Sequence, residues 1–195
     1  MATPIGHALI GGMLGIGYLL PRTGSPAAAL RALWEQRWPI IGVALLACLP
    51  DIDFLFGLPF GNINRFHQGY THSLGWIAIL VTGIWITWQR HSPGHGLARF
   101  VFLSVVAYSH LLLDIMTVDM GAPYGVYLFW PLYDQRIHTP LLYIFRDLDR
   151  THVFSAHNFR GLAWELAVTL PFFLLVLLWK AAPRAVGQIR SNQDR

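Results

Sequence analysis

The chain has 195 residues, of which 54% are hydrophobic and 12% are charged, and its formal net charge is +4. The charged share is about half that of an ordinary soluble domain, which excludes a typical soluble core and indicates an integral membrane protein. Because no Lys/Arg-rich block with interleaved aromatic residues is present, nucleic acid is not expected as a partner, whereas membrane lipid is.

Five apolar segments are expected to form helices. They cover about residues 5–20, 38–50, 73–89, 97–116 and 162–182. Crossing the hydrocarbon core takes roughly 20 helical residues. The segment at 38–50 is too short alone, so it predicts a helix that is interrupted at the membrane interface or shielded by its neighbours. We expect an all-α polytopic membrane bundle of about five apolar helices, with residues 1–183 forming a single metallohydrolase-like domain.

One long extramembrane loop, residues 117–161, separates the last two segments. Its Gly and Pro breaks and its aromatic runs indicate short strands or interfacial turns over one end of the bundle. Residues 184–195 are polar and basic, and we expect them to form a flexible tail.

The basic residues are distributed unevenly between the two ends of such a bundle. Nine of the 14 Lys and Arg residues follow the first, third and fifth segments, and four of the remaining five lie in the 117–161 loop. Cytoplasmic loops carry the excess of Lys and Arg. We therefore expect the N-terminus outside and the C-terminus in the cytoplasm, in the inner membrane of a bacterium or archaeon.

The ionisable side chains of the apolar segments share one end of the bundle. In an up-and-down arrangement, the starts of odd-numbered segments and the ends of even-numbered ones lie at one membrane face, here the face opposite the basic loops. The set comprises His7, Asp51, Asp53, His67, His72, His110, Asp114 and Glu165. Because ionisable residues within membrane segments indicate a functional site, we expect these eight side chains to converge.

The residue types in this set are those of a divalent-metal site. His110 and Asp114 are four residues apart, which places them on one helix face, and imidazole and carboxylate are usual ligands of zinc. Without a cation, the carboxylates would repel one another and resist desolvation. We expect one or two divalent ions, with Zn²⁺ as the favoured metal, on the outer side of the membrane.

The stretch FHQGYTHS places His67 and His72 directly before the third apolar segment. Gly69 lies between them and can form the turn that points both imidazole rings inward. Thr71 or Ser73 is a candidate N-cap for the helix that follows. Whether both histidines bind one metal or each binds a different one stays open from the sequence.

Each feature also has a simpler interpretation when it is taken alone. His7 can hydrogen-bond a neighbouring backbone group, and the PDID stretch can be a helix-end turn. His110 and Asp114 can form a neutral hydrogen-bonded pair. Glu165, expected in the first turn of the last helix, can complement the helix dipole.

Six motifs, in their order along the chain, resemble the YdjM-like family of inner-membrane, metal-dependent hydrolases. They are GHALIGG, LPDIDFL, FHQGYTHSLG, SHLLLDIMT, FWPL and NFRGLAWE, within residues 4 to 166. HQGYTHS stands where the family usually has H-R-G-x-T-H-S, so Gln68 replaces the common Arg and removes a charge that can face the substrate. The family is distantly similar to zinc-dependent phospholipases C and single-strand nucleases.

The resemblance implies a metal site smaller than that of the soluble enzymes, because only one H-x-x-x-D motif is present. The expected metal ligands are His7, Asp51, His67, His72, His110 and Asp114. Asp53 would bridge two ions or orient the attacking water, and Glu165 would act as a general base. Asn158 and Arg160 would either cap and position the last helix or contact a substrate anion.

We therefore expect a membrane-embedded metal-dependent hydrolase that cleaves a phosphoester of a lipid or lipid-linked substrate with metal-activated water. Two alternatives stay open. A transporter of metal ions or protons needs ligands near the membrane midplane and access from both faces. A non-catalytic membrane protein would use the metal structurally.

Overall fold

The computed structural model describes residues 2–62, 65–117, 125–137, 144–146, 149, 152 and 154–183. The α-helices in this part of the chain are α1 Pro4–Leu19, α2 Pro26–Glu35, α3 Arg37–Cys48, α4 Asp53–Gly57, α5 Leu74–His91, α6 Gly96–Ile115 and α7 Ala156–Ala181. Short 3₁₀ turns cover Leu49–Ile52, Leu58–Phe60 and Tyr70–His72. The prediction of an all-α bundle is confirmed.

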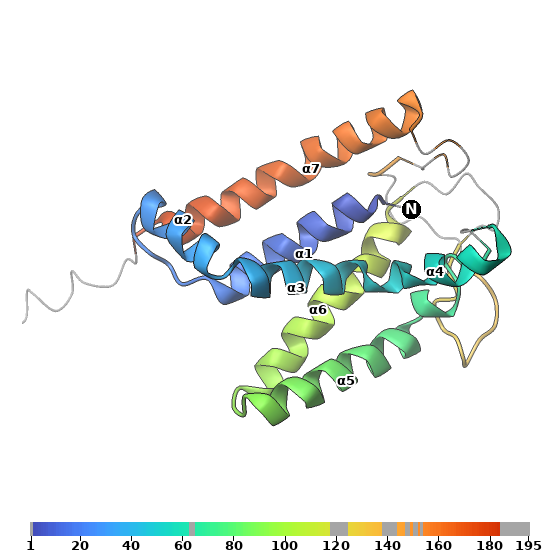
Figure 1. Cartoon of the computed structure of the whole chain (residues 1–195), viewed down its shortest axis with the longest axis horizontal. Helices are drawn as coiled ribbons and strands as arrows, with labels where there is room; N and C mark the ends of the chain where they lie inside the picture. The colour runs from blue at the N-terminus through green and yellow to red at the C-terminus, as the bar shows by residue number, and fades with distance from the viewer. Residues whose placement is uncertain are drawn as a thin grey trace, which may run out of the picture.

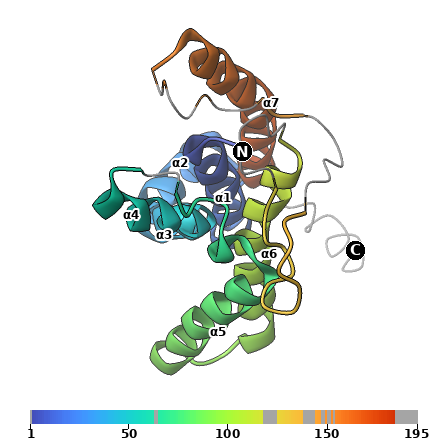
Figure 2. The ribbon, with the colours of Figure 1, turned by 90° about the vertical axis from the view of Figure 1, so that its right-hand side faces the viewer.

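The helices form an up-and-down bundle (Figure 1). α1 packs between α3 and α7, α6 crosses α1 and α3, and α5 packs along α6. The N-terminus, α4, the start of α5, the end of α6 and the start of α7 lie at the end of the molecule that faces the viewer in Figure 2. Side chains from five separate parts of the chain can therefore meet at this end.

Three helical stretches are long and apolar enough to cross a membrane. They are α6, α7 and the stretch Arg37–Phe60. In that stretch, α3 is followed by a 3₁₀ turn, α4 and a second 3₁₀ turn. α1 is a shorter apolar helix. The helix interruption predicted near residue 50 is present, because the 3₁₀ turn Leu49–Ile52 carries Pro50, which has no backbone N–H to donate.

The structure refines the expectation of about five apolar helices in three respects. α5 is not among the candidate membrane spans of the described chain. α2 was not expected, since its ten residues are amphipathic and form no apolar run. α7 begins at Ala156, six residues before the predicted start, because the Ser155 side chain accepts a hydrogen bond from the Asn158 N–H and so sets the N-terminus of the helix.

The 117–161 loop was expected to contain short strands or interfacial turns. Its described residues form turns and two isolated bridges, Thr117 with Phe145 and Val126 with Ile137, but no strand. The predicted flexible tail, 184–195, lies outside the described residues.

Glycines on one face of α1 bring it into close contact with α3. A Cβ atom at Gly11 would lie 2.6 Å from the Ala47 Cβ and 3.0 Å from the Ala44 Cα. A Cβ at Gly15 would lie 3.3 Å from the side chain of Val43. Small residues allow such close helix contacts in membrane bundles, and here they place the N-terminal half of α1 beside the end of α3.

The close contact at Gly11 predicts a loss of stability on substitution. Gly11→Ala is expected to lower the free energy of unfolding by about 1–3 kcal/mol, because the added methyl group overpacks the α1–α3 interface. Gly17→Ala is the matched control, since a Cβ at Gly17 meets nothing within 4 Å. Thermal unfolding in detergent, followed by circular dichroism, compares the two variants. Equal melting temperatures would contradict the close contact.

Candidate metal centre

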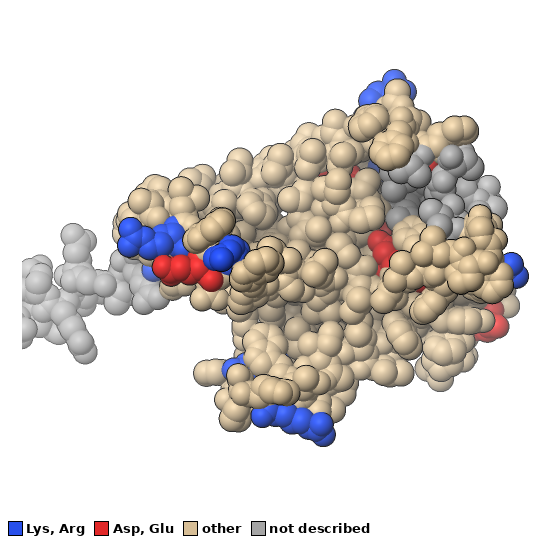
Figure 3. Space-filling model, in the orientation of Figure 1, with Lys and Arg blue, Asp and Glu red and all other residues tan. Residues whose placement is uncertain are grey.

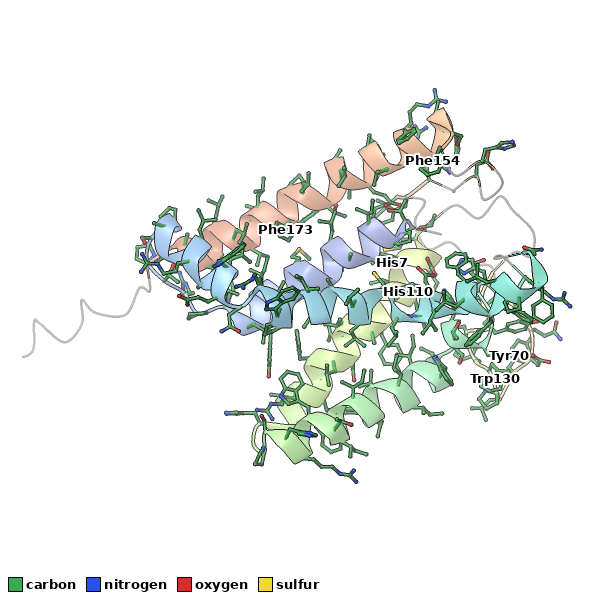
Figure 4. The ribbon with its side chains drawn as sticks, viewed as in Figure 1. His7, Tyr70, His110, Trp130, Phe154 and Phe173 are labelled. Carbon is green, nitrogen blue, oxygen red and sulfur yellow. The ribbon has the colours of Figure 1, made fainter. Side chains whose placement is uncertain are left out.

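Seven of the eight ionisable side chains singled out in the sequence meet in the interior at one end of the bundle. We call this set the His–Asp cluster; it comprises His7, Asp51, Asp53, His67, His72, His110 and Asp114. All seven residues are buried, and three of the histidines have no exposed surface. His7 from α1 and His110 from α6 lie side by side where the two helices cross (Figure 4).

Two carboxylate oxygens of the cluster approach the same pair of imidazole nitrogens. The Nε2 atoms of His72 and His110 lie 3.1 Å apart. The Asp51 Oδ1 atom lies 3.4 Å from the first and 3.5 Å from the second. The Asp114 Oδ2 atom lies 3.5 Å from the His72 Nε2 and 3.4 Å from the His110 Nε2. We call these residues the four-donor group.

These five distances are close to those between neighbouring ligand atoms of a zinc ion. Zinc–nitrogen and zinc–oxygen bonds of about 2.0–2.2 Å place neighbouring ligand atoms about 3.3–3.6 Å apart. The five measured separations lie between 3.1 and 3.5 Å. Two imidazoles and two carboxylates also favour zinc over magnesium or calcium, which prefer oxygen ligands alone. The four-donor group can therefore hold a Zn²⁺ ion.

Several polar atoms of the cluster lack a hydrogen-bond partner. Among the described residues these include both ring nitrogens of His7 and all four carboxylate oxygens of Asp51 and Asp114. A buried polar atom without a partner costs about 1–3 kcal/mol, and more when it is charged. Six such atoms lie within the His–Asp cluster, and coordination of divalent cations would satisfy them.

His7 extends the four-donor group towards α1. Its Nε2 atom lies 3.4 Å from the Asp114 Oδ1 atom, whereas the other oxygen of Asp114 faces His72 and His110. The described residues contain three triads with metal-ligand spacing: His7, His110 and Asp114; Asp51, His72 and His110; and Asp53, His67 and His72. The two oxygens of Asp114 thus face different histidines, so Asp114 would offer a ligand atom on either side.

Asp53 lies on the other side of His72 and has different partners. Its Oδ1 atom lies 3.0 Å from the Nδ1 of His67, and its Oδ2 atom accepts a hydrogen bond from the Thr71 hydroxyl at 2.8 Å. The His72 Nδ1 atom lies 3.2 Å from the same Oδ2. A carboxylate that binds the second nitrogen of a ligating histidine fixes the ring orientation and raises its basicity. Asp53 therefore can orient His72 towards the four-donor group.

The interrupted helix explains why the two aspartates contact opposite edges of one imidazole. Asp51 belongs to the 3₁₀ turn, and Asp53 begins α4. Asp51 approaches the Nε2 edge of His72, and Asp53 approaches the Nδ1 edge. The preceding residues also contribute, because the Ala47 carbonyl lies 2.8 Å from the Nδ1 of His110. That contact directs the Nε2 of His110 into the cluster.

The turn before α5 positions both histidines of the FHQGYTHS stretch. Gln68 has a φ of +55°, and a Cβ at Gly69 would lie 2.6 Å from the Phe66 carbonyl oxygen. Only glycine can occupy position 69 without displacing the backbone. Ser73 is the N-cap of α5 and accepts a hydrogen bond from the Trp76 N–H. Of the two candidate caps, Ser73 is therefore the cap, and Thr71 binds Asp53.

The two histidines of this turn titrate differently. Burial lowers the pKa of His67, although its hydrogen bond to Asp53 acts in the opposite direction. Burial acts on His72 in the same way, but the nearby carboxylates of Asp51 and Asp53 outweigh it and raise the pKa of His72. His67 is thus suited to remain a neutral partner of Asp53, whereas protons and metal ions compete for His72.

A family model described as the YdjM inner membrane protein matches residues 1–185. The chain belongs to the YdjM inner membrane protein family. It is also 35% identical over 147 residues to the inner membrane protein YbcI of Escherichia coli strain K12. The aligned residues cover 72% of this chain and 73% of that relative. No solved structure matches the chain. Together with the apolar helices, the match identifies an inner-membrane protein with transmembrane helices.

Glu165 lies outside the three triads of this YdjM-family chain. Its Oε1 atom accepts a hydrogen bond from the Thr3 N–H at 2.7 Å, and its Oε2 atom accepts one from the Thr3 hydroxyl. Thr3 is also the N-cap of α1. The expected position of Glu165 in the first helical turn is wrong, because α7 begins at Ala156. Its contacts favour a role in holding the start of α1, one turn before His7.

Asn158 and Arg160 were expected either to position the last helix or to contact a substrate anion. The Asn158 side chain accepts a hydrogen bond from the Asp149 N–H and donates to the Asp149 and His152 carbonyls. Arg160 is exposed and donates to the Ala156 carbonyl. These contacts favour the positioning alternative for Asn158, since its amide joins the loop to α7.

Sequence reasoning did not identify the partners that orient the cluster in this YdjM-family protein. They are the Thr71 hydroxyl, the Ala47 carbonyl and Thr3. A threonine next to His72 carries no distinct signal, and a backbone carbonyl carries none. Only the spacing of Thr3 and His7, one helical turn apart, could have indicated that the start of α1 needs an anchor.

Proposed function

We propose that the protein is a membrane-embedded metal-dependent hydrolase that cleaves a phosphoester of a lipid or lipid-linked substrate. The observation that carries the proposal is the set of buried, unsatisfied His and Asp atoms with the spacing of zinc ligands. A solvent-shielded cluster of this kind is costly to maintain without a bound cation. The resemblance of the motifs to metal-dependent hydrolases supports the same proposal.

The residues divide into two roles in the proposed enzyme. The four-donor group and His7 bind one or two Zn²⁺ ions, and Asp53 orients His72 and the attacking water. Bound zinc supplies a Lewis acid for the phosphoryl oxygen and a coordinated water whose pKa is lowered towards about 7. Asp53 also lines a cavity beside the cluster, so its carboxylate lies between the ligands and a place where substrate can enter.

We propose that the cluster lies on the outer side of the inner membrane. Basic side chains gather around α2 and the turn between α5 and α6, at the end away from the cluster (Figure 3). The positive-inside rule places that end in the cytoplasm. Labelling of single cysteines introduced at Arg31 and Phe154 with a membrane-impermeant reagent in intact cells tests this: only the Phe154→Cys variant should react.

The structural-metal alternative has one specific observation in its favour. The four-donor group supplies four protein ligands, which is the usual composition of a structural zinc site, whereas catalytic sites keep a position for water. The transporter alternative requires access from both faces, and the cluster lies near one end of the bundle.

Metal analysis of the detergent-purified protein, followed by a substrate screen, tests the proposed function. We expect one or two equivalents of zinc, and phosphate release from a lipid phosphoester that stops on chelation and returns with added zinc. Bound zinc without turnover of phosphomonoesters, phosphodiesters, carboxylic esters or amides would reject the hydrolase and favour a structural metal. Zinc flux into proteoliposomes would favour the transporter.

A further inference from the structure

Two hollows meet at the side chain of Trp76. The first, of about 550 Å³, adjoins the His–Asp cluster and is lined by Asp53, Thr71, Arg65, Arg136, Tyr127 and Trp130, among others. The second, of about 620 Å³, follows the surface of α5. Trp76, in the first turn of α5, lines both. We call them the arginine pocket and the α5 groove.

The arginine pocket presents positive charge without a matching carboxylate. The Nη1 atom of Arg136 donates to the Gln68 and Gly125 carbonyls, and its guanidinium lies 4.5 Å from the centre of the Tyr127 ring. Within the described part of the chain, no carboxylate pairs with Arg136. These contacts leave its Nε and Nη2 donors for a ligand. The Arg136 side chain is therefore fixed in place as an anion-binding group.

Arg65 adds a second cation to the same pocket. Its guanidinium lies 4.5 Å from the centre of the Phe60 ring and 5.6 Å from that of Phe66, and no described carboxylate pairs with it. Asp53 is the acidic residue of the pocket wall, and its oxygens are already engaged by Thr71 and the histidines. Two cations and one engaged carboxylate favour an anionic ligand such as phosphate.

Aromatic rings line the arginine pocket as well. Tyr70 and Trp130 lie together beyond the cluster (Figure 4), with ring centres 4.7 Å apart. Tyr70 also packs on Tyr127 at 5.3 Å. Such amphipathic rings concentrate at the headgroup level of a membrane. The pocket therefore combines anion binding with an environment suited to a lipid headgroup.

The α5 groove is suited to a hydrocarbon chain. It is lined by apolar residues such as Trp76, Ile79, Leu80 and Ile84 and extends to His91 in the last turn. Trp76 and His91 are 15 positions apart on α5, which corresponds to about 22 Å of helix and exceeds half of the roughly 30 Å hydrocarbon core. Gly83 lies in the groove, and a Cβ added there meets nothing within 4 Å.

We propose that the arginine pocket and the α5 groove bind one molecule, a membrane lipid with a phosphate-containing headgroup. The phosphate contacts Arg136 and Arg65 beside Asp53, and one hydrocarbon chain lies along α5. This assignment rests on the proposed hydrolase function and identifies the lipid phosphate as its substrate group. The contact with a substrate anion, which the sequence suggested for Arg160, is thereby assigned to Arg136 and Arg65, which line a pocket beside the cluster.

Quenching of tryptophan fluorescence by brominated lipids tests the proposal, because Trp76 lines both hollows. The full-length, zinc-loaded protein in a non-ionic detergent is titrated with brominated phosphatidic acid, with brominated diacylglycerol and with inorganic phosphate as a competitor. Phosphatidic acid should quench at low concentration. Diacylglycerol should need at least about tenfold more, because it lacks the charged hydrogen-bond acceptor. Displacement by equimolar inorganic phosphate would overturn the lipid assignment.

Matched variants separate the two parts of the site. Arg136→Gln and Arg65→Gln should each weaken binding of phosphatidic acid by about tenfold, whereas Arg160→Gln should not. The Arg65 guanidinium packs on the rings of Phe60 and Phe66 and is not hydrogen-bonded to the turn around Arg136, so its substitution leaves that turn intact. Gly83→Leu should fill the groove and weaken binding, whereas Gly42→Leu, also at a position with open space, should not. The assignment would be overturned if Arg160→Gln weakened binding as much as Arg136→Gln and Arg65→Gln do, or if Gly42→Leu weakened it as much as Gly83→Leu does.

The same measurements distinguish failure of this site from failure of the proposed function. Selective binding of phosphatidic acid that depends on Arg136, without hydrolysis of any phosphoester, would keep the lipid site and reject the enzyme. Zinc-dependent hydrolysis whose KM is unchanged in Arg136→Gln and Arg65→Gln would keep the enzyme and reject this site.

Discussion

Replacing His110 with alanine is expected to abolish stable zinc binding. The His110 Nε2 atom lies within 3.5 Å of His72 Nε2, Asp51 Oδ1 and Asp114 Oδ2, and His110 belongs to two of the three triads. The loss of zinc affinity should exceed the roughly 10–100-fold loss that follows removal of an outer-shell partner. Competition with a chromophoric chelator measures the affinity, and elemental analysis measures the zinc content.

Two further variants make the His110→Ala result specific. His152→Ala removes a histidine that also pairs with an aspartate, Asp149, at 3.2 Å, but whose side chain is 78% exposed; its zinc content should equal that of the unmodified protein. If two zinc ions are bound, His7→Ala should lower the zinc content by one and leave the four-donor group loaded, because the His7 Nε2 atom faces the oxygen of Asp114 that does not face His72 and His110. Unchanged zinc affinity in His110→Ala would reject the four-donor group.

The helix pattern was predictable where hydrophobicity alone decides it. α1, α6 and the interrupted α3–α4 stretch follow from apolar runs, a proline and a glycine-rich face. The start of α7 was misplaced because its first turn is polar and is set by the Ser155 cap, not by an apolar residue. α2 was missed because its ten residues are too few to cross a membrane and Arg31 interrupts its apolar residues. Caps and amphipathic helices depend on contacts that a search for apolar runs does not register.

The convergence of the cluster followed from topology, whereas the individual roles did not. An up-and-down order is enough to bring His7, His72 and Asp114 to one end. The difference between Asp51 and Asp53, two residues apart, depends on the 3₁₀ turn that points them at opposite edges of His72. The arginine pocket depends on a loop whose conformation the sequence does not indicate. Long-range side-chain geometry of this kind requires the folded backbone.

The contacts of Asp53 suit a group that orients neighbouring histidines better than they suit a zinc ligand. Thr71 donates to one of its oxygens, and the Nδ1 atoms of His67 and His72 lie 3.0 and 3.2 Å from the carboxylate. Asp51, in contrast, has no hydrogen-bond partner within the described chain. A carboxylate with satisfied oxygens resists displacement towards a metal, whereas an unsatisfied one is ready to coordinate. We therefore propose that Asp51 binds the metal and that Asp53 orients His72.

Asp53→Asn tests that division. The amide keeps the shape of the side chain but can no longer accept hydrogen bonds at both positions, so His72 loses its fixed orientation. Zinc should still bind, with an affinity reduced by roughly 10–100-fold, whereas Asp51→Asn should release it as His110→Ala does. Asp149→Asn, at the exposed His152 pair, is the control and should have no effect. If Asp53→Asn instead released zinc as fully as Asp51→Asn, Asp53 would be a direct ligand, and the second ion would lie between His67 and His72 instead of beside His7.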